Sequence, residues 1–210
     1  MASEQEPLEP LTPERRRAMT RRHLLEAAAI VFTRDGFHAA TLDDVASTAG
    51  FTKGAVYSNF KNKEDLFLAL VDDRIDRQLG VVVDVLEGGS HDAADQFPRV
   101  RSLFGGDLFW NDDFLTLYLE FVLYARRHPE ARAKLAASAA RSRGLVQRLV
   151  EEEYAAIGMA PKYATEDIAA ISLALFGGLG LDRLVDQSAV SEGTLDTTLA
   201  LLYDALLGGG

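Results

Sequence analysis

Apolar residues recur every three or four positions along most of this chain, and no segment shows a convincing strand-like alternation of apolar and polar residues. The pattern therefore predicts an all-α fold. Glycine and proline pairs mark the breaks between helices. The predicted helices cover about 12–36, 41–50, 52–60, 63–86, 93–104, 112–127, 130–157, 165–187 and 192–207.

Local capping signals support the N-terminal part of this assignment. Thr12 followed by Pro13 is typical of an N-cap and first helical position. Thr41 and Asp44 have the spacing of a capping box, and Asn62 can cap the helix that follows it. We expect a disordered tail at 1–11, a three-helix head at 12–62 and a larger helical body at 63–210, with the long helix from Lys63 linking head to body.

The bulk composition narrows the class of protein. The 210 residues include no cysteine, which excludes a disulfide framework and thiolate zinc sites and fits a reducing cytoplasm. The first residues do not have the pattern of a secretory signal, and no run of 18 uncharged apolar residues suggests a membrane span. We therefore expect a cytoplasmic protein with no membrane partner.

Charge is distributed unevenly in this acidic chain, whose formal charge is −10. Residues 10–63 carry nine lysines and arginines against five acids, whereas the residues from Glu64 onward carry 13 against 24. A cationic front on an anionic body suggests a polyanionic partner that meets one end of the molecule. A solvated helix face would give the same charge pattern.

Residues 41–60 have the spacing of a helix-turn-helix. The motif needs a small residue where its helices cross, a glycine at the turn and a branched apolar residue on the second helix. Ala46, Gly50 and Val56 supply these. The outward positions of the second helix are small at its start and hydrogen-bonding further along, as contact with bases and phosphates requires.

The stretch TLDDVASTAGFTKGAVYSNFKNKEDLF at 41–67 resembles the DNA-binding signature of the tetracycline-repressor-like (TetR) transcriptional regulators. The likeness covers about 23–67 closely, and the rest of the chain agrees only in length and helical character. The resemblance implies phosphate contacts from Thr41, Tyr57 and Lys63. The full set of candidate DNA-binding residues is Thr41, Thr52, Lys53, Gly54, Ala55, Tyr57, Ser58, Asn59 and Lys63.

Each of these positions also has a structural interpretation. Thr41 can act only as a cap, and Tyr57 can pack on the first helix. Asn59 and Ser58 differ from the family's common His and Tyr, so the operator sequence cannot be transferred from relatives. The arginines at 15–17, 21 and 22 resemble an arm that reaches the minor groove or the DNA backbone, although they could serve solubility alone.

An aromatic cluster lies between the linking helix and the last two helices. Helical spacing of such residues usually indicates core, but the resemblance implies a cavity here for a small hydrophobic effector. The candidate pocket residues are Phe104, Trp110, Phe114, Leu117, Tyr118 and Phe121.

The last two helices carry apolar positions at alternating spacings of three and four, which favours near-parallel helix packing. A seam inside one subunit would look the same. The family resemblance implies a two-fold dimer interface made by these helices. The candidate residues are Ile171, Leu175, Gly178, Asp182, Leu195, Leu199 and Leu202.

Enzyme chemistry is poorly supported. The four histidines are scattered without metal-ligand spacing, and the glycines at 177, 178 and 180 follow no strand, so neither a metal nor a dinucleotide cofactor is expected. The chain is therefore predicted to be a homodimeric transcriptional regulator, most simply a repressor released from a palindromic operator by a small-molecule effector. The alternatives are a helical adaptor that does not bind DNA and an all-helical enzyme.

Overall fold

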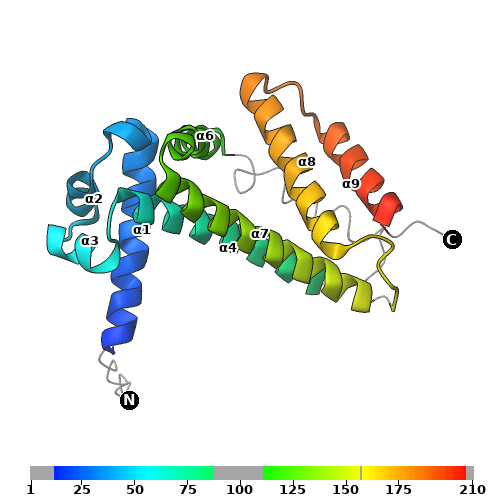
Figure 1. The fold of residues 1–210 in the computed structure, drawn as a ribbon, viewed down its shortest axis with the longest axis horizontal. Coiled ribbons are helices and arrows are strands. Elements are labelled where there is room, and N and C mark those ends of the chain that lie inside the picture. Colours follow the sequence, from blue (N-terminus) through cyan, green and yellow to red (C-terminus); the bar gives the residue numbers. More distant parts are fainter. Residues whose placement is uncertain (1–11, 88–110, 157, 207–210) are drawn as a thin grey trace, which may run out of the picture. The chain divides into compact units, whose positions relative to one another are not determined.

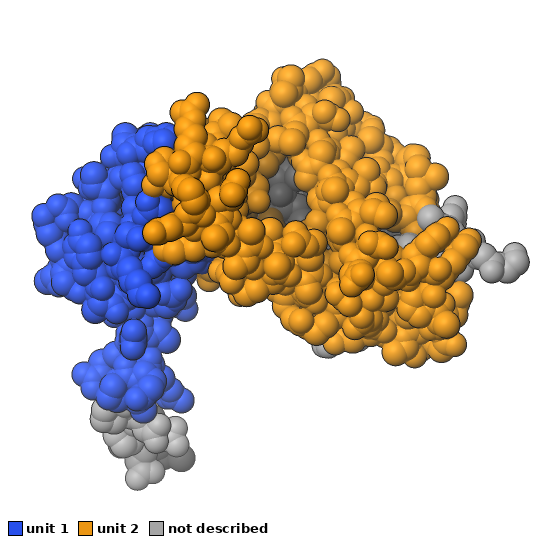
Figure 2. All heavy atoms as spheres, in the orientation of Figure 1, with its two compact units in different colours: residues 1–70 blue, residues 71–210 orange. Residues whose placement is uncertain are grey.

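The computed structural model describes residues 12–87, 111–156 and 158–206 of the chain. All regular structure in these ranges is α-helical, which confirms the predicted fold class (Figure 1). The predicted tail at 1–11 and the predicted helix at 93–104 lie outside the described residues. The chain divides into two compact units, residues 1–70 and 71–210, coloured separately in Figure 2.

Unit 1 is built on α1 (Pro13–Ala39), whose ends form as the local sequence predicts. The Thr12 hydroxyl accepts a hydrogen bond from the Arg15 amide at 3.2 Å, with Pro13 in the first turn. At the other end Gly36 has φ 74° and ψ 167°, a conformation that L residues rarely adopt. The helical path breaks at this glycine, where the sequence predicts the stop.

Helices α2 (Leu42–Ala49) and α3 (Lys53–Asn59) form a helix-turn-helix. Gly50 makes the turn with φ 70° and ψ 24°, the left-handed conformation that favours glycine. Ala46 and Val56 are buried on the facing sides of the two helices, and α1 packs against both. The three positions singled out by spacing therefore have the packing and turn roles expected of them.

Helix α4 (Lys63–Glu87) begins inside unit 1 and continues into unit 2. Phe67 in its second turn is fully buried, with its ring centroid 5.6 Å from that of Phe32 and 5.4 Å from that of Phe37. This aromatic cluster explains why unit 1 extends to Leu70, beyond the head boundary expected at residue 62.

Unit 2 contains the rest of α4 with α6 (Asp112–Arg127), α7 (Pro129–Ala156), α8 (Thr165–Val185) and α9 (Glu192–Leu206). Helix α7 packs against α6 and α8. The buried Ser138 hydroxyl and the Arg141 guanidinium of α7 both donate to the Asp72 carboxylate of α4. These bonds fasten α4 to α7.

Candidate nucleic-acid interface and effector cavity

Helix α3 presents a polar surface to solvent. Val56 is fully buried and fixes the inward face, while Thr52, Lys53, Gly54, Tyr57 and Ser58 are exposed. The Thr52 hydroxyl caps the helix by accepting from the Ala55 amide at 3.3 Å. Tyr57 is 57% exposed, which argues against the alternative that its ring only packs on α1.

The two residues at the end of α3 satisfy part of their hydrogen bonding within the helix. The Ser58 hydroxyl donates to the Ala55 carbonyl at 2.9 Å, and the Asn59 side-chain amide donates to the same carbonyl at 2.8 Å. Asn59 is half-buried. A base contact by Ser58 thus requires rotation of its hydroxyl or acceptance of a hydrogen bond by its oxygen.

Lys53 forms an exposed ion pair with Asp43 of α2. The hydrogen bond and charge of Asp43 raise the pKa of the Lys53 ammonium above its usual value. Lys53 therefore remains protonated over the neutral range, and Asp43 holds it between the two helices of the motif. The sequence predicts that Lys53 is exposed, but its spacing gives no sign of the pairing with Asp43, ten residues earlier.

Thr41 combines a capping role with exposure. Its hydroxyl accepts from the Asp44 amide at 3.1 Å and donates to the Asp44 carboxylate at 2.5 Å, and the residue remains exposed. The predicted cap is confirmed. A phosphate diester has no hydrogen to donate, so it would contact the Thr41 hydroxyl by accepting its hydrogen in place of the Asp44 carboxylate.

Lys63 is held more firmly than the sequence suggests. Its ammonium donates to the carbonyls of His38 at 2.9 Å and Ala40 at 3.0 Å and lies 4.8 Å from the centre of the Phe37 ring. Partial burial lowers its pKa. The ammonium thus ties the start of α4 to the end of α1, and its third N–H donor remains for another acceptor.

The arginines near the start of the chain lie on the helix α1 rather than in an extended arm. Arg21 stacks its guanidinium 4.5 Å from the centre of the Phe60 ring and donates to the Asn59 carbonyl at 3.5 Å. Phe60 itself is buried in the core of unit 1. Arg21 therefore contacts the end of α3 directly.

The candidate effector residues are only partly described, since Phe104 and Trp110 lie outside the described residues. Leu117 and Phe121 are buried in unit 2, whereas Phe114 and Tyr118 are half-buried. The Arg74 guanidinium lies 4.5 Å from the centre of the Phe114 ring, and burial raises the pKa of the Tyr118 hydroxyl. None of these four residues lines the described cavity.

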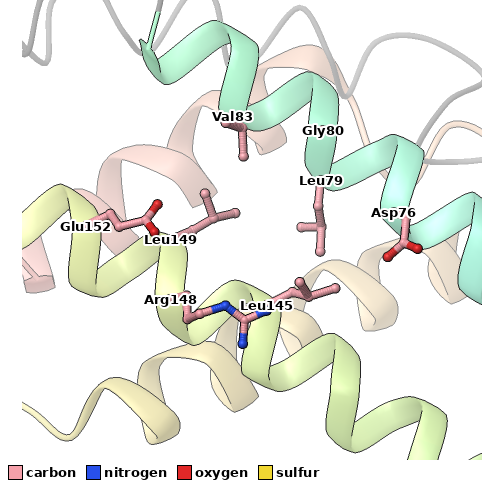
Figure 3. Close-up of a pocket in the computed structure, with 8 residues that line it drawn as sticks. All are labelled: Asp76, Leu79, Gly80, Val83, Leu145, Arg148, Leu149 and Glu152. Atoms are coloured by element: carbon pink, nitrogen blue, oxygen red, sulfur yellow. The ribbon is translucent and has the colours of Figure 1, made fainter.

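That cavity, of about 240 Å³, lies between α4 and α7 (Figure 3). Its walls are apolar, with Leu79 and Val83 on α4 facing Leu145 and Leu149 on α7. Its charged lining residues are Asp76, Arg148 and Glu152. The sequence shows these leucines and valine at helical spacing, but that pattern does not separate a cavity wall from a filled core.

Helix α8 has an exposed apolar face. Ile171 is 61% exposed and Val185 is 90% exposed, and Leu175, Gly178 and Asp182 are exposed at the intervening positions. By length and composition α8 could also cross a membrane, since 18 of its residues have a mean hydropathy of 1.7. A helix that buries an apolar face against a helix of another subunit can have the same apolar composition as a membrane-spanning helix.

The candidate dimer residues on α9 lie elsewhere. Leu195 and Leu199 are buried and pack with Val190, Phe176 and Leu179. The family resemblance implies that these two leucines lie at the dimer interface, whereas the structure buries them inside the subunit. The reason is that α9 uses its apolar face to cover one side of α8. Leu202 is half-buried.

Comparison with known proteins agrees with this geometry. The family model described as "Bacterial regulatory proteins, tetR family" matches residues 24–70. The chain is 44% identical over 48 residues to the HTH-type transcriptional regulator AcrR of Shigella flexneri, a match that spans 23% of this chain and 22% of AcrR. The stretch matched to AcrR is therefore less than a quarter of either protein.

Solved structures resemble the fold over most of the chain. A transcriptional regulator from Rhodococcus sp. Rha1 has a TM-score of 0.65 at 21% identity, covering 89% of this chain and 97% of that one. The regulator FadR from Bacillus subtilis, solved in complex with stearoyl-CoA, has a TM-score of 0.63 at 15% identity, covering 90% and 99%. These findings confirm the family resemblance, and the proteins concerned are transcriptional regulators and not enzymes.

Proposed function

We propose that this chain, whose N-terminal unit carries the DNA-binding segment of the tetR family, is a homodimeric transcriptional regulator that represses from a palindromic operator. The observation that carries the proposal is the exposed polar surface of α3. The buried Val56 anchors the opposite side of this helix in the core of unit 1, so the polar side faces solvent. The net positive charge of residues 10–63 favours a polyanion at this end of an acidic protein.

Two copies of α3 would enter successive major grooves about 34–36 Å apart. The contacts are divided by chemistry. Tyr57, Thr41 and Lys63 contact phosphates and fix the register, whereas Lys53, Gly54, Ala55 and Ser58 lie where base edges are met. Thr52 caps α3, and Asn59 supports its end. Holding both heads on one duplex gives the dimer its avidity.

The exposed face of α8 is the proposed dimer surface. Its apolar residues recur at spacings of four and three, as helix pairs that cross at a shallow angle require. Burial of this face in a dimer also explains the apolar composition of α8 without a membrane. We therefore propose a cytoplasmic protein.

A small hydrophobic effector would occupy one of two places. One is the cavity between α4 and α7, and the other is the region of the candidate aromatic residues at 104–121. The structurally similar FadR, solved with stearoyl-CoA, supports an apolar ligand. Because Asp72 fastens α4 to α7, a ligand that changes the α4–α7 separation would move α4 and with it Lys63. The spacing of the two heads would then change, and the operator would be released.

The proposal is tested by selecting bound duplexes from a random DNA pool with the purified full-length protein. We expect enrichment of an inverted repeat whose half-sites are one helical turn apart, about 10 base pairs centre to centre. Enrichment of no sequence, together with no salt-dependent DNA binding, would favour the adaptor. A turnover assay with a positive result would favour the enzyme.

Replacing Lys63 by Met should weaken binding of every duplex to a similar degree and lower the slope of log K against log salt by about one per subunit. Methionine keeps a side chain of similar length and removes the charge that the third donor would bring to a phosphate, together with the two hydrogen bonds to His38 and Ala40. Fluorescence anisotropy across a salt series measures both quantities.

Two variants make this result specific. Tyr57→Phe removes a hydroxyl but no charge, so it should lower affinity and leave the salt slope unchanged. Lys162→Ala, in the exposed segment between α7 and α8, should leave both unchanged. An unaltered slope for Lys63→Met would mean that Lys63 acts only on the carbonyls of His38 and Ala40.

Replacing Leu149 by Trp should fill part of the cavity and weaken binding of an apolar anionic probe, anilinonaphthalene sulfonate, by about tenfold or more. Fluorescence titration of the folded dimer measures this. Leu123→Trp on α6 is the control, because Leu123 is 65% exposed and does not line the cavity. Equal loss in both variants would place the probe elsewhere.

A further inference from the structure

The first two turns of α1 form a stem, residues 12–19, that makes no core contact. Every residue of the stem is exposed, and the buried face of α1 begins only at Leu24. Figure 2 shows unit 1 narrowing to this stem below its rounded part. Figure 1 shows the same part of α1 continuing past the end of α3. Packing within unit 1 therefore does not explain why the stem is helical.

The three adjacent arginines of the stem do not favour its helix, whereas Glu14 in the first turn does. Arg15 and Arg16 lie in the first turn of α1 and Arg17 follows directly after it, and the helix dipole disfavours cations near a helix N-terminus. None of their three guanidinium groups makes a hydrogen bond or ion pair with another described residue. By contrast Arg22 pairs with Glu26, and Arg34 pairs with Asp35. Three adjacent unpaired arginines thus lie at the N-terminal end of α1, where their positive charge destabilises the helix.

Their position relates them to α3. Arg21 contacts the Asn59 carbonyl and the Phe60 ring. These contacts place Arg21 of α1 beside Asn59, the last residue of α3. Arg17 lies four residues earlier, on the same face of α1 and about 6 Å further along its axis. The row from Arg21 to Arg17 therefore extends the cationic surface outward from the end of α3.

We propose that the stem binds DNA phosphates outside the segment read by α3, with Arg17 as its main contact and Arg15 and Arg16 as flanking charges. The inference rests on the proposed DNA-binding function. Because phosphate contacts carry no base information, the stem adds affinity and leaves the preferred sequence unchanged. It differs from an extended arm, because a helix of this width does not insert into a minor groove about 6 Å wide.

An anionic membrane would also attract these arginines. A membrane-surface helix, however, needs an apolar face beside its basic one. From Pro13 to Ala18 the stem has no large apolar residue, and Met19 stands alone at 40% exposure. The chemistry of the stem fits a polyanion contacted through charge alone.

The test compares wild type with Arg17→Gln and with the triple variant R15Q/R16Q/R17Q. Binding is measured over a salt series on the duplex selected from the random pool and on a random-sequence duplex of about 30 base pairs. Each lost phosphate contact should lower the salt slope by about 0.9, which corresponds to about eightfold in affinity at 0.1 M salt relative to 1 M. We expect the same decrease on both duplexes.

Arg34→Gln is the matched control, an arginine of the same helix about 25 Å from Arg17 and paired with Asp35 at 2.6 Å. It should not change the slope. The variant R15K/R16K/R17K keeps the charge and should keep the slope, which separates loss of charge from loss of helix. Circular dichroism monitors helix content in all variants.

The outcomes separate this inference from the proposed function. An unchanged slope in the triple variant, with wild type binding its selected duplex, overturns the stem contact alone. Failure of wild type to bind any duplex overturns the proposed function and the stem contact with it. Binding of vesicles containing phosphatidylserine that is lost in the triple variant, with DNA binding unchanged, also overturns the inference in favour of a membrane.

Discussion

Glutamate at both Ile171 and Leu175 is expected to separate the proposed dimer into monomers and to lower operator affinity by about 10²- to 10⁴-fold. Both side chains lie on the exposed face of α8, one turn apart, with Gly178 and Asp182 continuing the same face. Four new carboxylates per dimer would have to be buried against each other there, which costs several kcal/mol. A single head then binds DNA without the benefit of its twin.

Analytical ultracentrifugation of the double variant measures the oligomeric state, and anisotropy on the selected duplex measures the affinity. Leu123→Glu on α6 is the control, because Leu123 is as exposed as Ile171 and lies on another helix. It should remain dimeric. A double variant that stays dimeric with full affinity would show that the two-fold contact is made by another surface.

The helices of the head are predictable because their signals are local. Thr12, Thr41 and Thr52 each accept the hydrogen bond of the third residue after them, as their positions in the sequence indicate. Gly50 is needed for a left-handed turn, and its place between two short apolar patterns is visible without any tertiary information. Cap, turn and periodicity agree with one another over this segment.

The sequence does not predict which apolar helix faces are buried inside the subunit and which remain exposed. The outcome depends on contacts between residues that are far apart in the chain. Leu195 and Leu199 have the same spacing as Ile171 and Leu175, yet only the first pair is buried within the subunit. The cavity between α4 and α7 has the same origin. Whether Leu79 and Leu149 meet or leave a space depends on the separation of two helices that are far apart in sequence.

Polar side chains with a second role were also missed. The family resemblance implies a phosphate contact for Lys63, whereas in the structure two of its N–H donors bind the carbonyls of His38 and Ala40. Asp43 is one of the five acids of residues 10–63, and the sequence does not show that it pairs with Lys53. Motif matching identifies a position but does not show how the neighbouring chain uses the same atoms.

Replacing Phe67 by Ala is expected to destabilise unit 1 by about 3–5 kcal/mol and to abolish DNA binding. The ring is fully buried and meets Phe32 and Phe37 edge to face, so its removal leaves a cavity at the centre of a small core. Small domains have only about 5–15 kcal/mol of stability, which makes this loss a large part of the total. Urea denaturation followed by circular dichroism measures it. Ile30→Ala, at a position 59% exposed on α1, should change stability by no more than about 0.5 kcal/mol.

The behaviour of the dimer in the Phe67→Ala variant tests the division of the chain at Leu70. Phe67 lies on the part of α4 that belongs to unit 1, where its ring packs against Phe32 and Phe37. If the units fold separately, the variant should lose DNA binding at low urea while it remains dimeric and keeps binding the fluorescent probe. Loss of the dimer at the same urea concentration would instead mean that α4 couples the units into one cooperative structure. In that case an effector could act on the heads by changing their stability as well as their spacing.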